Sequence, residues 1–383
     1  MSLRPGIAVA APLLFLMGEV APAAQTNAPA ASKTAIALTT VAKGLENPWA
    51  LEFLPDGRML VTEKPGRLRV VEKDGKIGAA ITGVPEVMAR GQGGLLDVAL
   101  ANDFAESGRI FLSFSEPREA GKNGTSVASA RLVLAEDGGA LEDLKVIFRQ
   151  QPSYDSTLHF GSRIVVKPDG NLFVTLGERS LPTIRGEAQN PTNQIGKVVY
   201  ITPEGAPAAS SPAHDGWDPL VWSIGHRNVQ GAVLDPATGQ LWTLEHGPQG
   251  GDELNHPESG KNYGWPVIIY GKEYSGGPVG AGITAKDGLE QPVYYWNPSI
   301  ATSSLLLYTG DLFPEWKGNF LVGALKYMQV QRLVMKDGTV VAHEVLGADD
   351  IGERVRDVKQ GPDGAVYLVT DDADGRIVRM APQ

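Results

Sequence analysis

The sequence predicts an all-β protein, a six-bladed β-propeller of four-stranded antiparallel blades, and three observations lead to this prediction. A turn followed by a short apolar strand recurs six times along the chain. Long amphipathic helical patterns are scarce, which argues against an α/β fold. The 383 residues include 46 Gly and 27 Pro, a larger share than the roughly 12% of an average chain, as a chain with many turns requires.

Each repeat has a small or acidic turn residue and a glycine that can take a positive φ, and a β-branched or aromatic run follows. In order, the six copies are PDGRMLVTE, ESGRIFLSF, PDGNLFVTL, PATGQLWTL, EWKGNFLVG and PDGAVYLVT, with glycines at Gly57, Gly108, Gly170, Gly239, Gly318 and Gly364. Further strands flank several copies, such as SRIVV before and KVVYIT after the third. The copies are about 61 residues apart, whereas a blade takes about 40–50, so the excess predicts long loops. A β-sandwich or β-helix is the alternative.

The first 24 residues have the order of a secretory signal peptide. One positive charge, Arg4, precedes an apolar run from Ile7 to Met17, and small residues around Ala23 and Ala24 offer a cleavage site. The run is too short to cross a bilayer, and no later stretch approaches that length. We therefore expect a signal peptide at 1–24, a linker with nothing to bury at 25–33, the propeller domain at 34–383, and a periplasmic or secreted bacterial protein. A disordered extension is the alternative.

Composition excludes several classes of function. The chain has no Cys, which excludes disulfides, thiolate metal sites, a Cys nucleophile and covalent c-type haem attachment. Its formal net charge of −10 argues against nucleic acid as a partner, because such binding needs a basic face.

Polar residues gather in the segments between the repeats, where loops from all blades of a propeller converge. Taken singly, each residue has an ordinary interpretation, such as a surface His, a solvated Arg-x-Arg pair, or turn acids at Asp252 and Glu253. Their joint occurrence favours a site. The residues concerned are Gln92, His159, Arg227, Asn228, Lys326, Arg354 and Arg356.

These segments carry a resemblance that spans the chain after the leader, in order. The matching strings include GQGGLLDVAL at 91–100, HFGSRIVVKPDGNLFVTLGER at 159–179, VWSIGHRNVQG at 221–231, EHGPQGGDELN and KNYGWP within 245–266, and ERVRDVKQGPDGAVYLVTDD at 353–372. The chain resembles the soluble pyrroloquinoline-quinone (PQQ) dehydrogenases, and within them the bacterial aldose sugar dehydrogenase branch. That family has a six-bladed propeller with PQQ in a cleft at one end, in agreement with the repeats.

The resemblance implies a role for each matching residue. His159 corresponds to the catalytic base, Arg227 to the group that stabilises negative charge on the quinone, and Glu178 to the carboxylate that orients the base. The positions that bind the quinone are Gln92, Arg227, Asn228, Lys326, Arg354, Arg356 and, on a looser match, Tyr274. The main-chain carbonyls of Gly247 and Pro248 correspond to ligands of a Ca²⁺ beside the cofactor, and Glu253 and Tyr263 to a second, structural Ca²⁺ site.

The implied chemistry explains these residue types. PQQ carries three carboxylates, which arginine and lysine side chains bind. A neutral His159 would remove the proton of the C1 hydroxyl of an aldose while hydride passes to the quinone, and the product is a lactone. Ca²⁺ would polarise the quinone. Without a haem site, the electrons must pass to an external acceptor.

Two positions differ from the glucose-dehydrogenase branch. Leu158 replaces an acidic residue next to the base, and Glu178 replaces an Asp, so strict glucose specificity is not expected. Two other functions remain open, namely a calcium-dependent propeller hydrolase such as a lactonase, and a carbohydrate-binding propeller without activity. The sequence leaves the preferred sugar open and allows a monomer or a dimer.

Overall fold

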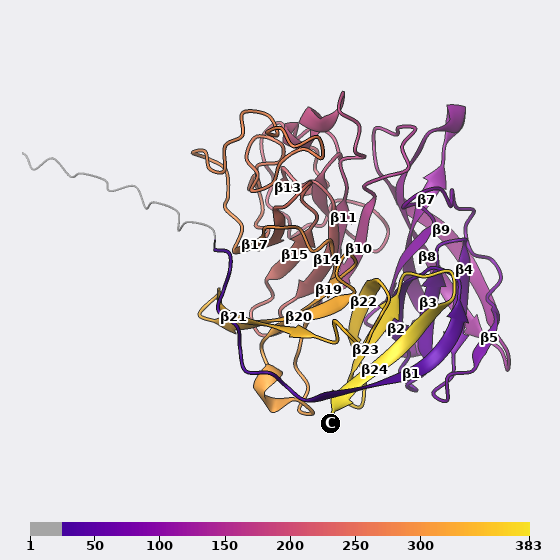
Figure 1. Ribbon diagram of the computed structural model, residues 1–383. Coiled ribbons are helices and arrows are strands. Elements are labelled where there is room, and N and C mark those ends of the chain that lie inside the picture. Colours follow the sequence, from indigo (N-terminus) through magenta and orange to yellow (C-terminus); the bar gives the residue numbers. More distant parts are fainter. Residues whose placement is uncertain (1–24) are drawn as a thin grey trace, which may run out of the picture.

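The structure is a computed structural model that describes residues 25–383, and it confirms the six four-stranded antiparallel blades (Figure 1). The predicted signal peptide at 1–24 lies outside the described residues. The first three blades comprise β2 (Pro48–Phe53), β3 (Met59–Glu63), β4 (Arg67–Val71) and β5 (Ile77–Ala80); β6 (Leu95–Leu100), β7 (Arg109–Pro117), β8 (Asn123–Leu134) and β9 (Gly139–Arg149); and β10 (Gly161–Val166), β11 (Leu172–Leu176), β12 (Lys197–Ile201) and β13 (Val221–Ile224).

The last three blades include the strand that closes the ring. They comprise β14 (Val229–Leu234), β15 (Leu241–Glu245), β16 (Asp252–Asn255) and β17 (Tyr294–Trp296); β18 (Thr302–Leu307), β19 (Phe320–Ala324), β20 (Gln329–Lys336) and β21 (Thr339–Leu346); and β22 (Val355–Gln360), β23 (Val366–Thr370), β24 (Gly375–Pro382) and β1 (Ile36–Leu45). The N-terminal β1 thus supplies the outer strand of the sixth blade, where it lies beside β24 in Figure 1. This pairing ties the two ends of the domain together.

All six predicted turn glycines join the first strand of a blade to its second. Each has a positive φ, between 66° at Gly108 and 88° at Gly57, a conformation that is free of strain only for glycine. The innermost strands β2, β6, β10, β14, β18 and β22 contact one another in a closed ring. The predicted long loops lie mainly in the third and fourth blades, at 177–196, 202–220 and 256–293.

Hydroxyl groups bind neighbouring blades together. Thr62 on β3 donates to the carbonyl of Leu96 on β6, and Thr175 on β11 donates to the carbonyl of Val229 on β14, at 2.8 Å. Such bonds satisfy buried main-chain groups of the innermost strands, which have a sheet partner on one side only. They also fix the positions of the loops that precede those strands.

The expectation that residues 25–33 bury nothing is wrong. The carbonyl of Gln25 accepts a hydrogen bond from Tyr295 N at 2.9 Å, and the carbonyl of Pro29 accepts one from His343 N at 2.9 Å. Ala28 is 4% exposed in the core between the fourth and fifth blades. The segment therefore lies along β17 and β21 (Figure 1). The small residues of this segment allow it to pack closely against the blades. The same residues are typical of a free linker, which is why the sequence predicts one here.

Helices are few and short among the described residues. They are α1 (Phe104–Ser107) and the 3₁₀ turns at Glu119–Gly121, Arg185–Gln189 and Pro314–Trp316. Within residues 25–383, none of the helices has the length and apolar character needed to cross a membrane.

Candidate active site

Most of the predicted site residues lie at one end of the propeller, in two kinds of loop, whereas Arg356 and Glu253 lie within β22 and β16. Gln92, His159 and Arg227 precede the innermost strands β6, β10 and β14, whereas Glu178 and Lys326 follow the second strands β11 and β19. Because the second strand runs antiparallel to the innermost strand, its end lies beside that strand's beginning. The topology therefore gathers residues from five separate segments of the chain.

His159 and Glu178 form a buried hydrogen-bonded pair. Nδ1 of His159 lies 2.5 Å from Oε1 of Glu178, and their side chains are 8% and 2% exposed. Nε2 of His159 has no hydrogen-bond partner among residues 25–383. A carboxylate on Nδ1 holds the proton there and leaves the lone pair on Nε2. The longer carboxylate of Glu178 thus reaches the imidazole.

Burial governs the protonation of this pair. Burial, followed by the positive charge of Arg227, holds the pKa of His159 well below its ordinary value. Burial raises the pKa of Glu178 to about 7, although Arg227 opposes this rise. Both shifts disfavour an ion pair, so the imidazole is neutral near pH 7. A neutral imidazole with a free Nε2 is the form that can accept a proton.

Gln92 and Asn228 anchor the main chain around His159. Oε1 of Gln92 accepts a hydrogen bond from His159 N at 2.8 Å, and Oδ1 of Asn228 accepts one from Gly161 N at 3.0 Å. The structure thus brings three predicted residues together, from the loops before β6, β10 and β14. Both amides bond to backbone through one oxygen, and their NH₂ groups make no hydrogen bond within 25–383.

Arg227 joins the His159 region to the loop at 246–251. Its main-chain N donates to Oε2 of Glu245 at 2.7 Å, and its Nη1 donates to the carbonyl of Gly247 at 2.8 Å. The guanidinium lies 5.1 Å from the ring centroid of Trp265. Its Nε is buried and has no hydrogen-bond partner in the part of the chain that the structure describes.

Three basic side chains surround one acid in a second cluster. We call it the rim cluster, and it consists of Lys64, Arg354, Arg356 and Asp371. Asp371 contacts Nη2 of Arg356 at 2.5 Å, Nζ of Lys64 at 3.5 Å and Nε of Arg354 at 3.9 Å. Burial raises the pKa of Asp371, but Arg356 and Lys64 outweigh it and hold that pKa below its ordinary value. Three cations thus face one carboxylate, an excess of positive charge, and Arg354 is half exposed.

Lys326 and Tyr274 are both exposed. Lys326 is exposed, and its Nζ lies 5.0 Å from the ring centroid of Tyr327. Tyr274 is 74% exposed, and its hydroxyl makes no hydrogen bond to the residues described. Its neighbour Glu273 pairs with Arg185 of the third blade. The structure therefore places Tyr274 on a loop beside the site but does not bring its side chain into contact with the other predicted residues.

The loop at 246–251 is held so that main-chain carbonyls remain available. A Cβ on Gly247 would lie 2.2 Å from the carbonyl oxygen of Gly250, so only glycine fits there. Asp252, fully buried, accepts hydrogen bonds from Gly247 N at 2.9 Å and Ala301 N at 2.8 Å. The carbonyl of Pro248 accepts no hydrogen bond from the described part of the chain. Asp252 is thus a loop anchor, although its sequence context suggested a turn acid.

Glu253 lies in a buried acidic cluster together with Glu245 and Asn255. Nδ2 of Asn255 donates to Glu245 at 3.0 Å and to Glu253 at 3.2 Å, while its Oδ1 is buried without a partner. Burial and the charge of Glu245 raise the pKa of Glu253 well above its ordinary value. Tyr263 stacks on His226 at 5.0 Å, and Nδ1 of His226 bonds to Glu245. This oxygen-rich cluster has no cationic side chain paired with Glu253 among the described residues.

The middle of the ring contains the central cluster, which we define as Asp97, Arg163 and Asp357. Arg163 on β10 lies 2.8 Å from Asp97 on β6 and 3.2 Å from Asp357 on β22. It also donates to the carbonyl of Gln230 on β14 and packs on Trp49 of β2. All three charged side chains are at most 4% exposed. One cation therefore fills the place where five of the innermost strands meet.

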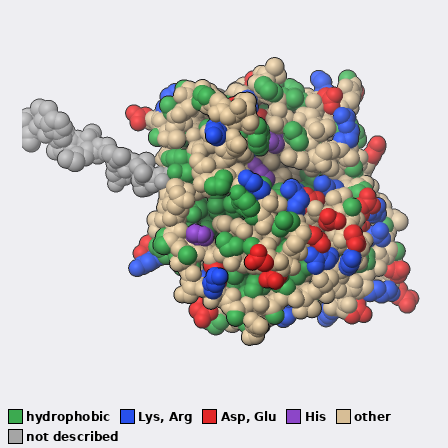
Figure 2. Space-filling view, in the orientation of Figure 1, with side chains coloured by type: hydrophobic (Ala, Val, Ile, Leu, Met, Phe, Trp, Pro, Cys, Tyr) green, Lys and Arg blue, Asp and Glu red, His purple; other side chains and the backbone are tan. Residues whose placement is uncertain are grey.

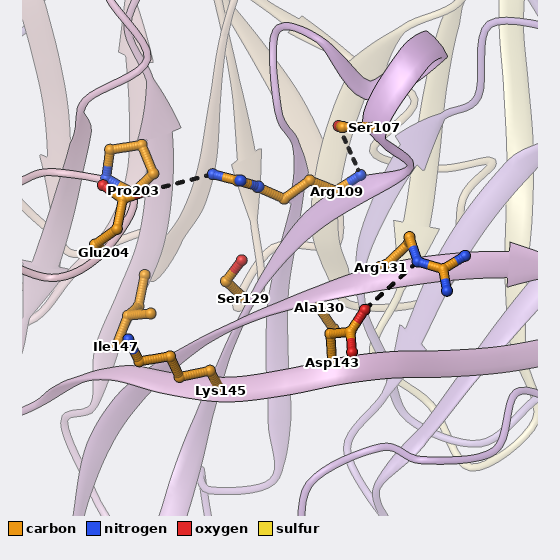
Figure 3. Close-up of a pocket in the computed structure, with 10 residues that line it drawn as sticks. All are labelled: Ser107, Arg109, Ser129, Ala130, Arg131, Asp143, Lys145, Ile147, Pro203 and Glu204. Atoms are coloured by element: carbon orange, nitrogen blue, oxygen red, sulfur yellow. Dashed lines mark hydrogen bonds and ion pairs between the residues drawn. The ribbon is translucent and has the colours of Figure 1, made fainter.

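A pocket on the outer side of the second blade has a different character (Figure 3). Arg109 pairs with Glu204 at 3.5 Å, and Arg131 pairs with Asp143 at 3.6 Å. None of the predicted site residues lines this pocket. Figure 2 shows histidine side chains close to Lys and Arg side chains near the middle of one face, whereas acidic and basic side chains alternate near its right edge. Acidic and basic side chains are thus paired on the outer surface of this blade.

Sequence reasoning missed several residues of the site, and a signal was available for some. An acid or Lys stands six to eight residues after a turn glycine, near the end of the second strand, at Glu63, Glu178, Glu245, Lys326 and Asp371. This recurrence would have found Glu245 and Asp371, because the ends of the second strands of a propeller face the same end of the ring. No comparable signal distinguishes Lys64, Arg179, Arg185 or Trp265, whose partners belong to other segments.

Comparisons with known proteins identify the family. Residues 45–379 match the family model described as Glucose / Sorbosone dehydrogenase. The chain is 43% identical over 345 residues to the aldose sugar dehydrogenase YliI of Escherichia coli (strain K12), covering 88% of this chain and 91% of the relative. The apo-form structure of the soluble aldose sugar dehydrogenase from Escherichia coli is 40% identical, with a TM-score of 0.86, over 91% of this chain and 100% of that chain.

A more distant relative has been solved with PQQ bound. The PQQ-bound form of aldose sugar dehydrogenase from Streptomyces coelicolor is 27% identical, with a TM-score of 0.77, and the match covers 93% of this chain and 100% of that one. These matches confirm the resemblance drawn from the motifs. The chain therefore belongs to the glucose/sorbosone dehydrogenase family.

Proposed function

We propose that this protein is a PQQ- and Ca²⁺-dependent dehydrogenase that oxidises aldose sugars at C1 to lactones. The observation that carries the proposal is the excess of positive charge at the loop end, where three cations face Asp371 within the same group of loops as the His159–Glu178 pair. A base and an anion-binding surface together suit a dehydrogenase with an anionic cofactor. The relatives named as aldose sugar dehydrogenases support the substrate class.

The cationic residues fit a cofactor with several carboxylates. Nε of Arg227 and Nε of Arg356 are buried without partners among residues 25–383, and Arg354 and Lys326 are exposed enough to bind a ligand. Buried polar atoms without partners are rare in proteins, and a ligand is one explanation for them. We assign the carboxylates of PQQ to Lys326, Arg354 and Arg356, and its quinone oxygens to the side of Arg227.

Two groups of oxygen atoms fit Ca²⁺, which prefers carbonyl and carboxylate ligands. The free carbonyl of Pro248 and that of Gly247 would hold the ion beside the cofactor. The unpaired Oδ1 of Asn255 and the carboxylate of Glu253 suit a second ion, with the main-chain carbonyl of Tyr263 as a further ligand. Ca²⁺ at the first position would withdraw electron density from a quinone oxygen.

The chain itself supplies the proton transfer. Nε2 of His159 would accept the proton of the C1 hydroxyl, and Glu178 would stabilise the imidazolium through Nδ1. Bound PQQ supplies the acceptor for the hydride that leaves C1. Arg227 would stabilise negative charge beside the loop at 246–251. Leu158 is 39% exposed next to the base and has no charge, which suits a broad range of aldoses.

The central cluster opposes the hydrolase alternative. A calcium-dependent lactonase needs several carboxylate or amide ligands in the middle of the ring, and here Arg163 occupies that place between Asp97 and Asp357. A carbohydrate-binding propeller without activity would not require the buried His159–Glu178 pair. We further propose export from the cytoplasm, on the leader-like residues 1–24, and transfer of electrons to a separate acceptor.

An activity assay tests the proposal. The protein lacking residues 1–24 is mixed with PQQ and Ca²⁺, and reduction of a redox dye is measured with a panel of aldoses. We expect dye reduction that depends on PQQ, on Ca²⁺ and on sugar. PQQ binding without dye reduction for any sugar would contradict the dehydrogenase assignment. Hydrolysis of lactones without PQQ would instead support the hydrolase.

A further inference from the structure

We infer that Arg179 is a positioning residue for the base, because its guanidinium holds the main chain of His159 and places a positive charge next to the imidazole. The inference rests on the proposed function, in which His159 is the base. Arg179 directly follows Glu178, the other member of the pair, and its side chain turns back toward the segment 156–160.

The contacts of Arg179 are almost all with that segment. Its Nη1 donates to the carbonyl of His159 at 3.2 Å, and its Nη2 donates to the carbonyl of Ser156 at 2.8 Å. The guanidinium lies 3.7 Å from the ring centroid of Phe160, and Nη2 also donates to Oδ1 of Asn123. Arg179 is only 1% exposed. One planar group thus binds the residues on both sides of the base.

The backbone at His159 needs such support. His159 has a φ of 49° and Arg179 a φ of 69°, in the left-handed region that is unfavourable for residues with a Cβ. The carbonyl of His159 also lies close to Gly177, where a Cβ would be 2.0 Å from that oxygen. The hydrogen bond from Nη1 of Arg179 to this carbonyl, and that from Nη2 to the carbonyl of Ser156, hold the imidazole where Glu178 can reach it.

The charge of Arg179 acts on the same pair. Among the described residues, its guanidinium has no carboxylate within ion-pair distance. The other titratable or charged groups that face His159 are Glu178, Arg227, Arg185 and His246. Each arginine in this set favours the neutral imidazole. Arg179 is the one among them that also bonds to the backbone of His159.

Two substitutions separate position from charge. Arg179→Met removes both, and Arg179→Lys keeps the charge but loses the planar fork. The pKa of His159 is measured in the cofactor-free protein by ¹⁵N NMR of labelled histidines, with His159→Gln to assign the signal. In the loaded enzyme, kcat and KM are measured for one aldose. Arg118→Met is the matched control, a largely buried arginine that bonds to Ser126 and pairs with Glu116.

For Arg179→Met we expect a higher His159 pKa and a kcat lower by about 100-fold, with KM and PQQ affinity close to wild type. For Arg179→Lys we expect a His159 pKa near wild type and a kcat still lower by about 10-fold. Wild-type kcat in the folded Lys variant, or an unchanged His159 pKa in a folded Met variant, would overturn the inference. If the Met variant does not fold, the Lys variant decides. An inactive wild-type protein would instead contradict the proposed function, and the NMR measurement would still test Arg179.

Discussion

Two buried clusters of charged side chains lie in the same ring of strands. One has more acids than cations, and the other has more cations than acids. In the central cluster one cation, Arg163, lies between two acids, Asp97 and Asp357. In the rim cluster one acid, Asp371, lies among three cations, of which Arg354 is half exposed. The first cluster satisfies its charges within the protein. The second leaves positive charge for a partner from outside.

This difference separates structural charge from functional charge. A buried charge requires a counter-charge and hydrogen bonds, because removal from water is strongly unfavourable. Asp97 and Asp357 also accept hydrogen bonds from the main-chain N atoms of Ile164 and Leu51 in neighbouring blades. The central cluster thus joins blades together. The rim cluster contacts few backbone groups and suits a ligand with several carboxylates.

The largest effect is expected at the base beside the rim. His159→Ala should lower kcat by about 100- to 10,000-fold, the usual loss on removing a general base. PQQ affinity should remain close to wild type, because the carboxylates of PQQ are assigned to Lys326, Arg354 and Arg356 and not to His159. Dye-reduction kinetics and a fluorescence titration with PQQ measure the two quantities. His214→Ala, on a loop where His214 bonds to Ser259, is the control, and a near-normal kcat for His159→Ala would place the base at another residue.

The central cluster should dominate stability. Arg163→Met leaves two buried acids without their cation, and breaking a buried ion pair in this way typically lowers the free energy of unfolding by about 3–5 kcal/mol. Urea unfolding of the cofactor-free protein measures the change. The matched rim variant Arg354→Met should change that free energy by less than about 1 kcal/mol, since this side chain is half exposed. Equal losses in both variants would remove the distinction between the clusters.

The rim should dominate cofactor affinity. Arg354→Ala should raise the Kd for PQQ by about 10- to 100-fold, because a hydrogen bond to a charged group contributes about 1.5–3 kcal/mol. Lys326→Ala should act in the same direction. Lys317→Ala removes an exposed lysine that pairs with Asp311 and serves as the control. An unchanged Kd in both rim variants would refute the assigned role.

The pH dependence of activity should follow Glu178. Its pKa is raised to about 7, and a protonated Glu178 would donate to Nδ1 and move the imidazole proton to Nε2, where it blocks the base. We therefore expect kcat/KM to fall as the pH drops through about 7, by about tenfold per unit below it. Glu178→Gln should lack this inflection. The raised pKa also means that this carboxyl favours the folded state at low pH, an effect that is lost as the pH rises through about 7.

The smallest effect concerns the acidic cluster of Glu245, Glu253 and Asn255 in the fourth blade. Removal of Ca²⁺ with a chelator should lower the Tm by about 2 °C or more, since an ion that binds the folded state stabilises it and the buried Glu253 and Glu245 then have no cation. Glu253→Gln should reduce this sensitivity. Differential scanning calorimetry with and without Ca²⁺ measures the shift, and an identical shift in wild type and variant would exclude Glu253 as a ligand.

Much of the fold could be predicted because its signals are local. The turn glycines before apolar runs identify six blades, and all six have the expected positive φ. The segment 25–33 could not be judged in this way. Its small residues resemble a free linker, yet Ala28 is buried against the fourth and fifth blades. Its burial depends on a surface formed by strands of the fourth and fifth blades, far along the chain.

The candidate site could be predicted only in part, because short motifs can be read from the sequence but contacts between distant segments cannot. Motifs around His159, Arg227 and Arg356 are contiguous strings, so the sequence alone indicates the residue types and the family. The partners of Arg163 and Arg179 could not be read from strings. Asp97, Arg163 and Asp357 stand in three different blades, and their balance exists only once the ring closes.

The sequence by itself thus determined the six blades, the family and the set of polar loop residues, because turns, alternating strands and motifs are encoded within a few neighbouring residues. Only the tertiary structure decided which charges are paired and which remain open for a ligand. Arg163 lies between two acids and Arg354 stands half exposed beside a shared one. Charge pairing depends on distance in space, and the closure of the ring through β1 and β24 sets that distance.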